Sequence, residues 1–401
     1  MTYDIARIRA DFPALKNGWA FFDGPGGTQV PVQVADAIAD ALAQPLSNRG
    51  TVTEGEQNAE RIVVDARRAI ADLLGGDPQG VVFGRSATAL AYDFSRMLSS
   101  SWNPGDEVVV TKLDHDSNIR PWVQAAERAG ATIRWIDFDP STGELDLDQL
   151  AGVLSERTRL VAVTAASNLI GTLPPVAEIS RLAHGVGALV YVDGVHNTAH
   201  EFVDVTALGA DFYSCSPYKF LGPHLGALIA DPALLEGLRP DKLLPATDDV
   251  PERFEFGTLP YEYLAAVTAA VGYLAGLSGS TAKTRRQRLA DSFTALATHE
   301  AALRSRLEAG IAELAGVTVH SRAEHRTPTM LITFDDRNAA DAYVHLATRK
   351  IAAPAGNFYA LEASRHLGLG DAGGLRVGLA PYNTADEIDR LVAGLREFLQ
   401  G

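Results

Sequence analysis

The chain has 401 residues, of which 46% are hydrophobic and 21% charged, as in ordinary globular proteins that are large enough for two domains. Its formal net charge of −15 argues against nucleic acid or an anionic membrane as the main partner. A single cysteine, Cys215, excludes an internal disulfide framework and a zinc site built from cysteines.

The N-terminal stretch lacks the hydrophobic core of a signal sequence, and no apolar run approaches the length of a membrane span. We therefore expect a cytoplasmic protein with no membrane partner.

The N-terminal part of the chain is expected to combine helices with short strands. A strand within 19–31 runs into a glycine-rich turn, and a buried strand at 81–83 leads into a helix through Gly84–Ala91. Free N–H groups and the helix dipole make such a helix start a candidate phosphate site, although ordinary Ser/Thr capping explains the same residues. Helices are predicted over 4–16, 32–44 and 54–74.

The middle of the chain alternates further strands with helices. Most of these strands are continuous apolar runs rather than alternating ones, which indicates a mainly parallel sheet covered on both faces. Each polar cluster follows a strand, where open α/β sheets place their ligands. Strands are predicted at 107–111, 132–136, 160–164 and 189–193, with polar exits at 114–122 and 167–172.

The C-terminal part has a different character and predicts a smaller α+β domain. We expect an N-terminal segment (1–25) that packs with this small domain, a large domain (26–260) and the small domain itself (261–401). Residues 231–260 are expected to form a loop rich in proline and aspartate. Helices are predicted around 261–276, 283–314 and 384–399, and strands at 316–320, 329–334 and 376–379.

Two strand ends carry the most informative residues of the chain. Lys219 follows an apolar run and precedes a Gly/Pro turn, so it is held at the mouth of the sheet. Apolar neighbours desolvate such an amine, which lowers its pKa and frees the neutral form to make a Schiff base. Asp193 ends the strand before it, and His196 follows closely.

Together these residues supply what pyridoxal phosphate requires. Lys219 would bond the aldehyde carbon, and Asp193 would keep the pyridine nitrogen protonated so that the ring accepts electrons. His196 would bond the phenolic oxygen of the ring. For either residue alone, a solvated turn lysine or a helix N-cap is the better explanation, but the order and context of the pair favour the cofactor.

These motifs resemble those of the class V aminotransferase family of fold-type I pyridoxal phosphate enzymes, most closely its cysteine-desulfurase-like branch. The resemblance covers almost the whole chain and implies a mainly parallel, seven-stranded type of α/β sheet. It also implies a homodimer with shared active sites. In it, Lys219 is the Schiff-base lysine, His115 stacks on the pyridine ring, and Asp193 and His196 bond the ring nitrogen and phenolic oxygen. The resemblance further implies a phosphate cup of Ser86, Ala87, Thr88, Ser216 and Tyr218. It implies that Thr258 contacts the phosphate of the neighbouring subunit. Substrate contacts are implied for Asn168, Asn357 and Arg376, the last of which clamps the α-carboxylate.

One departure from the family pattern bears on the chemistry. Desulfurases carry a nucleophilic cysteine on a mobile loop before the arginine, whereas this chain has Tyr359 at or beside that place. The only thiol, Cys215, lies in the strand that leads to Lys219, where a cysteine is normally inert. We therefore expect no persulfide-forming desulfurase. Tyr359 is expected to act as an acid for a leaving group or to close the pocket.

The expected reaction acts on an amino acid through an external aldimine. By analogy with the desulfurase branch we favour elimination or substitution at the side chain, such as carbon–sulfur cleavage. An aminotransferase, an epimerase or racemase, and a cyclase stay open as alternatives. A non-catalytic cofactor-binding regulator is disfavoured because the chain has no basic patch, and a sugar aminotransferase because Arg376 suits an α-carboxylate.

Overall fold

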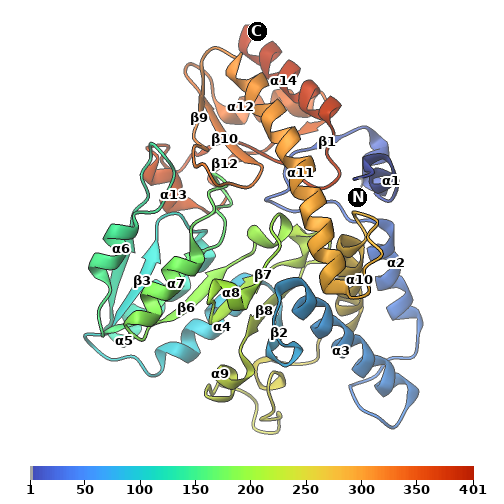
Figure 1. Cartoon of the computed structure of the whole chain (residues 1–401), viewed down its shortest axis with the longest axis vertical. Helices are drawn as coiled ribbons and strands as arrows, with labels where there is room; N and C mark the ends of the chain where they lie inside the picture. The colour runs from blue at the N-terminus through green and yellow to red at the C-terminus, as the bar shows by residue number, and fades with distance from the viewer. Residues whose placement is uncertain (1–2) are drawn as a thin grey trace.

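A computed structural model describes residues 3–401, so that the first two residues of the predicted N-terminal segment lie outside it. It confirms the predicted α/β fold, in which one large sheet is joined to a smaller α+β region that contains the C-terminus (Figure 1). The large sheet has seven strands. Their spatial order is β2 (Val81–Gly84), β8 (Gly226–Ala230), β7 (Phe212–Cys215), β6 (Leu189–Asp193), β5 (Thr158–Thr164), β3 (Glu107–Thr111) and β4 (Thr132–Ile136).

The strands from β7 to β4 are parallel to one another, and β8 is antiparallel to both of its neighbours. Successive residues of one strand enter different cores. In β2, for example, Val81 and Phe83 belong to one hydrophobic cluster and Val82 to another. Both faces of the sheet are therefore covered, which is why the strands are continuously apolar rather than alternating.

Helices supply the cover on both faces. The longest of those before the small domain, α3 (Glu54–Leu74), begins with a capping box between Thr53 and Glu56 and ends at Gly75 with φ of 77°. The other helices of this part are α2 (Val32–Ala43), α4 (Ala87–Ser99), α5 (Arg120–Ala129), α6 (Leu147–Val153), α7 (Val176–Gly185), α8 (Val205–Leu208), α9 (Pro232–Glu236) and α10 (Tyr261–Ala275).

The small region is built on an antiparallel sheet in the order β12 (Ala355–Gly356), β13 (Gly374–Gly378), β10 (Thr329–Phe334) and β9 (Val317–Val319). The N-terminal strand β1 (Ala20–Phe21) pairs in parallel with β11 (Ile351–Ala352). Ala20 and Phe22 accordingly pack in the core of this region. Its helices are α12 (Ala339–Ala347), α13 (Leu361–His366) and α14 (Ala385–Gln400).

The long helix α11 (Arg285–Ala312) runs from the large sheet to the small one (Figure 1). Its buried residues up to Leu296 belong to the same hydrophobic cluster as α10 and the large sheet, and those from Leu303 onward belong to the cluster of the small sheet. This packing favours a domain boundary inside α11. The change in composition predicts a division at residue 260 instead, and the division into two domains stays a prediction.

Two local predictions are wrong. The helix expected over 4–16 is α1 (Ile5–Ala10) followed by a separate 3-10 turn, because Pro13 cannot continue the helix. The loop expected over 231–260 contains α9, which begins after the capping residue Asp231 with proline in its first turn.

Within residues 3–401, no helix combines the length and apolar character needed to cross a bilayer.

Candidate active site

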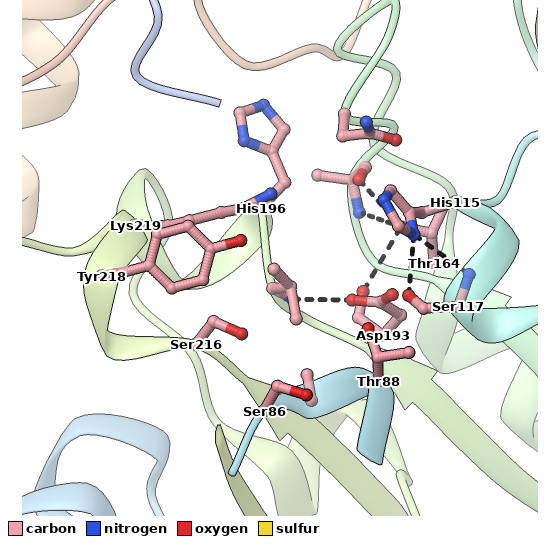
Figure 2. A pocket seen from close by; sticks show the side chains of 14 residues that line it. Ser86, Thr88, His115, Ser117, Thr164, Asp193, His196, Ser216, Tyr218 and Lys219 are labelled. Carbon is pink, nitrogen blue, oxygen red and sulfur yellow. Dashed lines mark hydrogen bonds between the residues drawn. The ribbon is translucent and has the colours of Figure 1, made fainter. Parts of the chain in front are cut away.

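Most of the residues predicted for the site converge at the edge where the parallel strands β3, β5, β6 and β7 end. Asp193, the last residue of β6, pairs in register with Thr164 of β5 and Ser214 of β7. Lys219 follows β7 and His115 follows β3, so their side chains reach one cavity (Figure 2). That cavity is lined by Ser86, Ala87, Thr88, His115, Ser117, Thr164, Ala166, Asn168, Asp193, Val195, His196, Ser216, Tyr218 and Lys219.

Lys219 is 5% exposed and ends the 3-10 turn Pro217–Lys219. Burial lowers the pKa of its amine to about 8, and the positive charge of Arg376 adds to this effect. The carboxylates of Asp193 and Asp23 oppose the shift but do not cancel it. The amine is thus much more often neutral near pH 8 than a free lysine, which is the form that attacks an aldehyde.

Asp193 is also buried, and it lines the same cavity as Lys219. Its Oδ1 accepts a hydrogen bond of 2.9 Å from the backbone N–H of Val195. Between them, Gly194 allows the turn to pass over Tyr213, since a Cβ there would lie 1.9 Å from the tyrosine ring. Burial raises the pKa of Asp193. A cationic partner in the cavity would hold the carboxylate in its ionised form.

His115 is fixed in one tautomer. Its Nδ1 accepts from the backbone N–H of Ser117 at 3.0 Å and lies 2.7 Å from the Ser117 hydroxyl. The ring proton is therefore on Nε2. Burial, and the charges of Lys219 and Arg376, lower the pKa of His115 to about 3. A neutral, flat imidazole thus forms one wall of the cavity.

The start of α4 also lines the cavity. Ser86 caps the helix through an acceptor bond from the N–H of Ala89 at 3.1 Å, so ordinary capping is present. Gly226 allows β8 to approach closely, since a Cβ there would lie 2.3 Å from the backbone of Ser86. Ala87 and Thr88 of the first turn line the cavity together with Ser216 and Tyr218, and a helix start with hydroxyl groups beside it is suited to a phosphate.

Two buried polar atoms of the cavity have no partner among residues 3–401. They are Nδ1 of His196 and Oδ1 of Asn168. Buried polar atoms are normally paired, so these two indicate a polar ligand that meets them in the cavity. Together with a desolvated lysine, a buried carboxylate and a helix start, they fit pyridoxal phosphate.

Four predicted residues do not line this cavity. Arg376 is 2% exposed, and its guanidinium is occupied by Asp23 at 2.6 Å and by the carbonyl of Asn168 at 3.0 Å. The ring of Phe358 covers it at 3.7 Å. Thr258 is exposed and lies away from the cavity of its own chain.

The other two, Asn357 and Tyr359, lie in the loop that follows β12. Asn357 is used within this loop, since it accepts from the N–H of Tyr359 at 3.0 Å and donates to the carbonyl of Asp371 at 2.8 Å. Tyr359 is 74% exposed and lies over His115 with ring centroids 5.6 Å apart. Its carbonyl accepts from the N–H of Asp116 at 2.7 Å, which ties the loop to the cavity rim. The loop thus covers the entrance.

Several residues of this arrangement were not singled out from the sequence. Ser117 lies two positions after His115, a spacing from which its bond to the ring could have been inferred. Asp23 and Phe358 gave no such signal, because their contacts with Arg376 join distant parts of the chain. Asp114 was also missed. Burial raises its pKa to about 8 behind the cavity, although bonds from Thr111 and Asn118 oppose that shift.

Cys215 is fully buried as the last residue of β7, and burial raises the pKa of its thiol. The thiolate needed for sulfur chemistry is thereby disfavoured. We predict that Cys215→Ser leaves turnover within a few-fold of the wild type, apart from a modest loss of stability of about 1 kcal/mol. Steady-state kinetics and mass spectrometry for a protein persulfide check this. Loss of activity with cofactor and fold intact, and a persulfide on the wild type, would contradict it.

Fold and site together define a pyridoxal phosphate-dependent enzyme. Residues 20–391 match the family model described as aminotransferase class-V, and the chain belongs to this family.

Two curated relatives extend over nearly the whole chain. A cysteine desulfurase of Dickeya dadantii is 33% identical and covers 98% of this chain and 96% of its own. An aminotransferase-like protein of Gibberella zeae is 30% identical and covers 99% of each. Among solved structures, the cysteine desulfurase CsdA of Escherichia coli superposes with a TM-score of 0.88 at 25% identity, covering 100% of this chain and 99% of that one. The predicted family is confirmed.

Proposed function

We propose that this enzyme cleaves or substitutes a bond in the side chain of an amino acid, with carbon–sulfur cleavage as the favoured case, and forms no protein persulfide. The observation that carries the second part is the position of Cys215, fully buried in β7, together with Tyr359 on the loop where desulfurases keep their cysteine. The relatives named cysteine desulfurase support chemistry at a substrate sulfur.

Lys219 would hold pyridoxal phosphate, and the helix start at Ser86–Thr88 with Ser216 and Tyr218 would bind its phosphate. Asp193 would pair with the ring nitrogen and His115 would lie against the ring face. When bound, the cofactor withdraws electrons from the substrate Cα. Lys219, once released, would take the Cα proton, a task that suits an amine with a pKa of about 8.

The entrance loop would exclude water from the reacting bond. Asn168 links the cavity to this loop through a bond of 3.0 Å from its Nδ2 to the carbonyl of Phe358. Tyr359 presents its ring at the entrance beside Thr88, Tyr92, Asp116 and Arg120. Its exposure favours the role of a cover over that of a buried acid.

A panel of amino acids with thiol, thioether, carbamoyl or carboxyl side chains tests the proposal, with products identified by mass spectrometry. A 2-oxo acid formed with release of ammonia and of a thiol or sulfide, from the wild type and from Cys215→Ser, supports it. Stoichiometric amino transfer to a 2-oxo acid acceptor would instead favour an aminotransferase, in line with the relative from Gibberella zeae. Inversion at Cα would favour an epimerase.

We also propose a homodimer in which each subunit completes the site of the other. Thr258 lies outside the cavity of its own chain, and the neighbouring Phe256 exposes 55% of an apolar ring, as interface residues do before assembly. We predict a dimer in sedimentation at micromolar concentration and weaker cofactor retention in Thr258→Ala. A monomer with its cofactor fully bound would contradict both.

A further inference from the structure

His196 lies where the two domains meet. The residue follows β6 in the large domain, is 2% exposed, and lines the cavity across from Ser86 in Figure 2. Its Nε2 lies 3.0 Å from the hydroxyl of Thr327 and 3.0 Å from that of Thr329. Thr329 is the first residue of β10, and Thr327 lies just before that strand, so both belong to the small domain. The backbone of His196 therefore belongs to the large domain, whereas its ring is hydrogen-bonded by residues of the small domain.

The hydroxyl protons determine which nitrogen of His196 carries its hydrogen. Thr327 has a second acceptor, the carbonyl of Gly171, at 3.4 Å. For the buried hydroxyl of Thr329, the acceptor within hydrogen-bond distance among residues 3–401 is Nε2 of His196. A proton on Nε2 would leave that buried hydroxyl without an acceptor, and buried polar groups are normally paired. Nε2 must therefore accept, and the ring proton belongs on Nδ1.

The ring is neutral in this environment. Burial lowers the pKa of His196, and the positive charges that bear on it are His200, Lys219 and Arg376. His200 packs edge-on against the ring with centroids 4.9 Å apart, while its own Nδ1 bonds Glu300 at 3.0 Å. Nδ1 of His196 thus carries the single proton and is the atom that lacks a partner.

We propose that Thr329, assisted by Thr327, fixes His196 as the Nδ1–H tautomer, so that Nδ1 donates a hydrogen bond to the phenolic oxygen of the bound cofactor. This inference rests on the proposed attachment of pyridoxal phosphate to Lys219. Thr329 is then a positioning residue that acts through His196. Thr329 belongs to the small domain and His196 to the large one. Nδ1 is therefore fixed as the donor only while β10 packs against the segment that follows β6.

The first test is a pH titration of the absorbance of the bound cofactor in the holoenzyme. A donor to the phenolic oxygen stabilises its negative charge and so weakens its hold on the proton of the imine made with Lys219. Thr329→Val removes the acceptor preference of Nε2, and the imine should then titrate about 0.5–1 pH unit higher than in the wild type. Thr329→Ser keeps a hydroxyl and should restore the wild-type midpoint.

Thr333→Val is the matched control, since it removes a similar bond of 2.9 Å between a threonine of β10 and His320, which does not line the cavity. Its midpoint should equal that of the wild type. An unchanged midpoint in Thr329→Val, with cofactor still reduced onto Lys219 by borohydride, would overturn the inference and leave the proposed function standing.

The second test reads the tautomer directly and does not depend on catalysis. In protein labelled with 15N-histidine and freed of cofactor, the resonances lost in His196→Gln identify this ring. A protonated Nδ1 and an unprotonated Nε2 are expected in the wild type. A protonated Nε2 would overturn the inference even if Thr329→Val failed to fold. Absence of cofactor on Lys219 after borohydride would refute the proposed function alone.

Discussion

Replacing Lys219 with alanine is expected to abolish turnover, by about 10³-fold or more, and to remove the cofactor absorbance that borohydride reduces. The reason is that, in the proposed function, one buried amine serves both as the attachment point and as the base at Cα. Its depressed pKa, about 8, makes the neutral form available for both tasks. Absorbance spectra before and after reduction, with mass spectrometry of the labelled peptide, measure the effect.

The loss should not be due to unfolding. Burial disfavours the protonated amine of Lys219, so in the cofactor-free protein this group costs stability below its folded-state pKa, and alanine removes that cost. The thermal midpoint of the cofactor-free variant should therefore not fall. Lys283→Ala, which changes an exposed lysine, should keep both activity and reducible absorbance. A Lys219→Ala protein that still forms a reducible link would refute the assignment.

The parts of this protein that could be predicted from sequence are those that depend on local patterns. Continuous apolar runs give the parallel strands, because both faces of the sheet are covered. Asp193 and Lys219 each lie just beyond a strand, and neighbouring parallel strands bring their ends to one edge. Two local features therefore sufficed to predict the centre of the candidate site, the small and hydroxyl residues after β2 marked the helix start as a phosphate site, and the family resemblance added His115.

The parts that could not be predicted depend on contacts between segments that lie far apart in the sequence. Asp23 and Arg376 are 353 positions apart in the sequence. They come together because β1 pairs with β11 and because Asp23, which follows β1, bridges to Gly378 of β13. The bonds from Thr327 and Thr329 to His196 span 131 and 133 positions. No local pattern marks such contacts. The entrance loop is a further case, since Phe358 and Tyr359 have φ of 53° and 59°, values that their residue types do not suggest.

Arg376 also gives a prediction with a large effect. If it clamps the α-carboxylate of the substrate, Arg376→Ala should weaken binding of amino acids by about 2–4 kcal/mol, or roughly 30- to 700-fold, because a charge-assisted bond is lost. Arg376→Lys should recover only part of this, since an ammonium cannot replace the planar guanidinium. Spectroscopic titration of the holoenzyme with the substrate found by the amino-acid panel measures both.

The structure adds a condition to that prediction. Asp23 holds one end of the guanidinium at 2.6 Å, and Phe358 covers its face at 3.7 Å, whereas Nε has no partner among residues 3–401. An incoming carboxylate must therefore share Arg376 with Asp23 or displace it. Asp23→Asn keeps the shape and removes the competing charge, so it should tighten binding of α-carboxylates while Arg376→Ala weakens it.

The substrate's methyl ester separates this clamp from a general loss of structure. The ester lacks the carboxylate charge, so its affinity should change little in either variant, and the cofactor content of both should match the wild type. If Arg376→Ala bound the amino acid as tightly as the wild type does, the guanidinium would serve only to hold Asp23 and the carbonyl of Asn168. If the acid and the ester lost affinity equally, Arg376 would support the shape of the site without recognising a charge. The opposite signs expected for Asp23→Asn and Arg376→Ala with the acid, and the small effects expected with the ester, follow only from a clamp that two carboxylates contest.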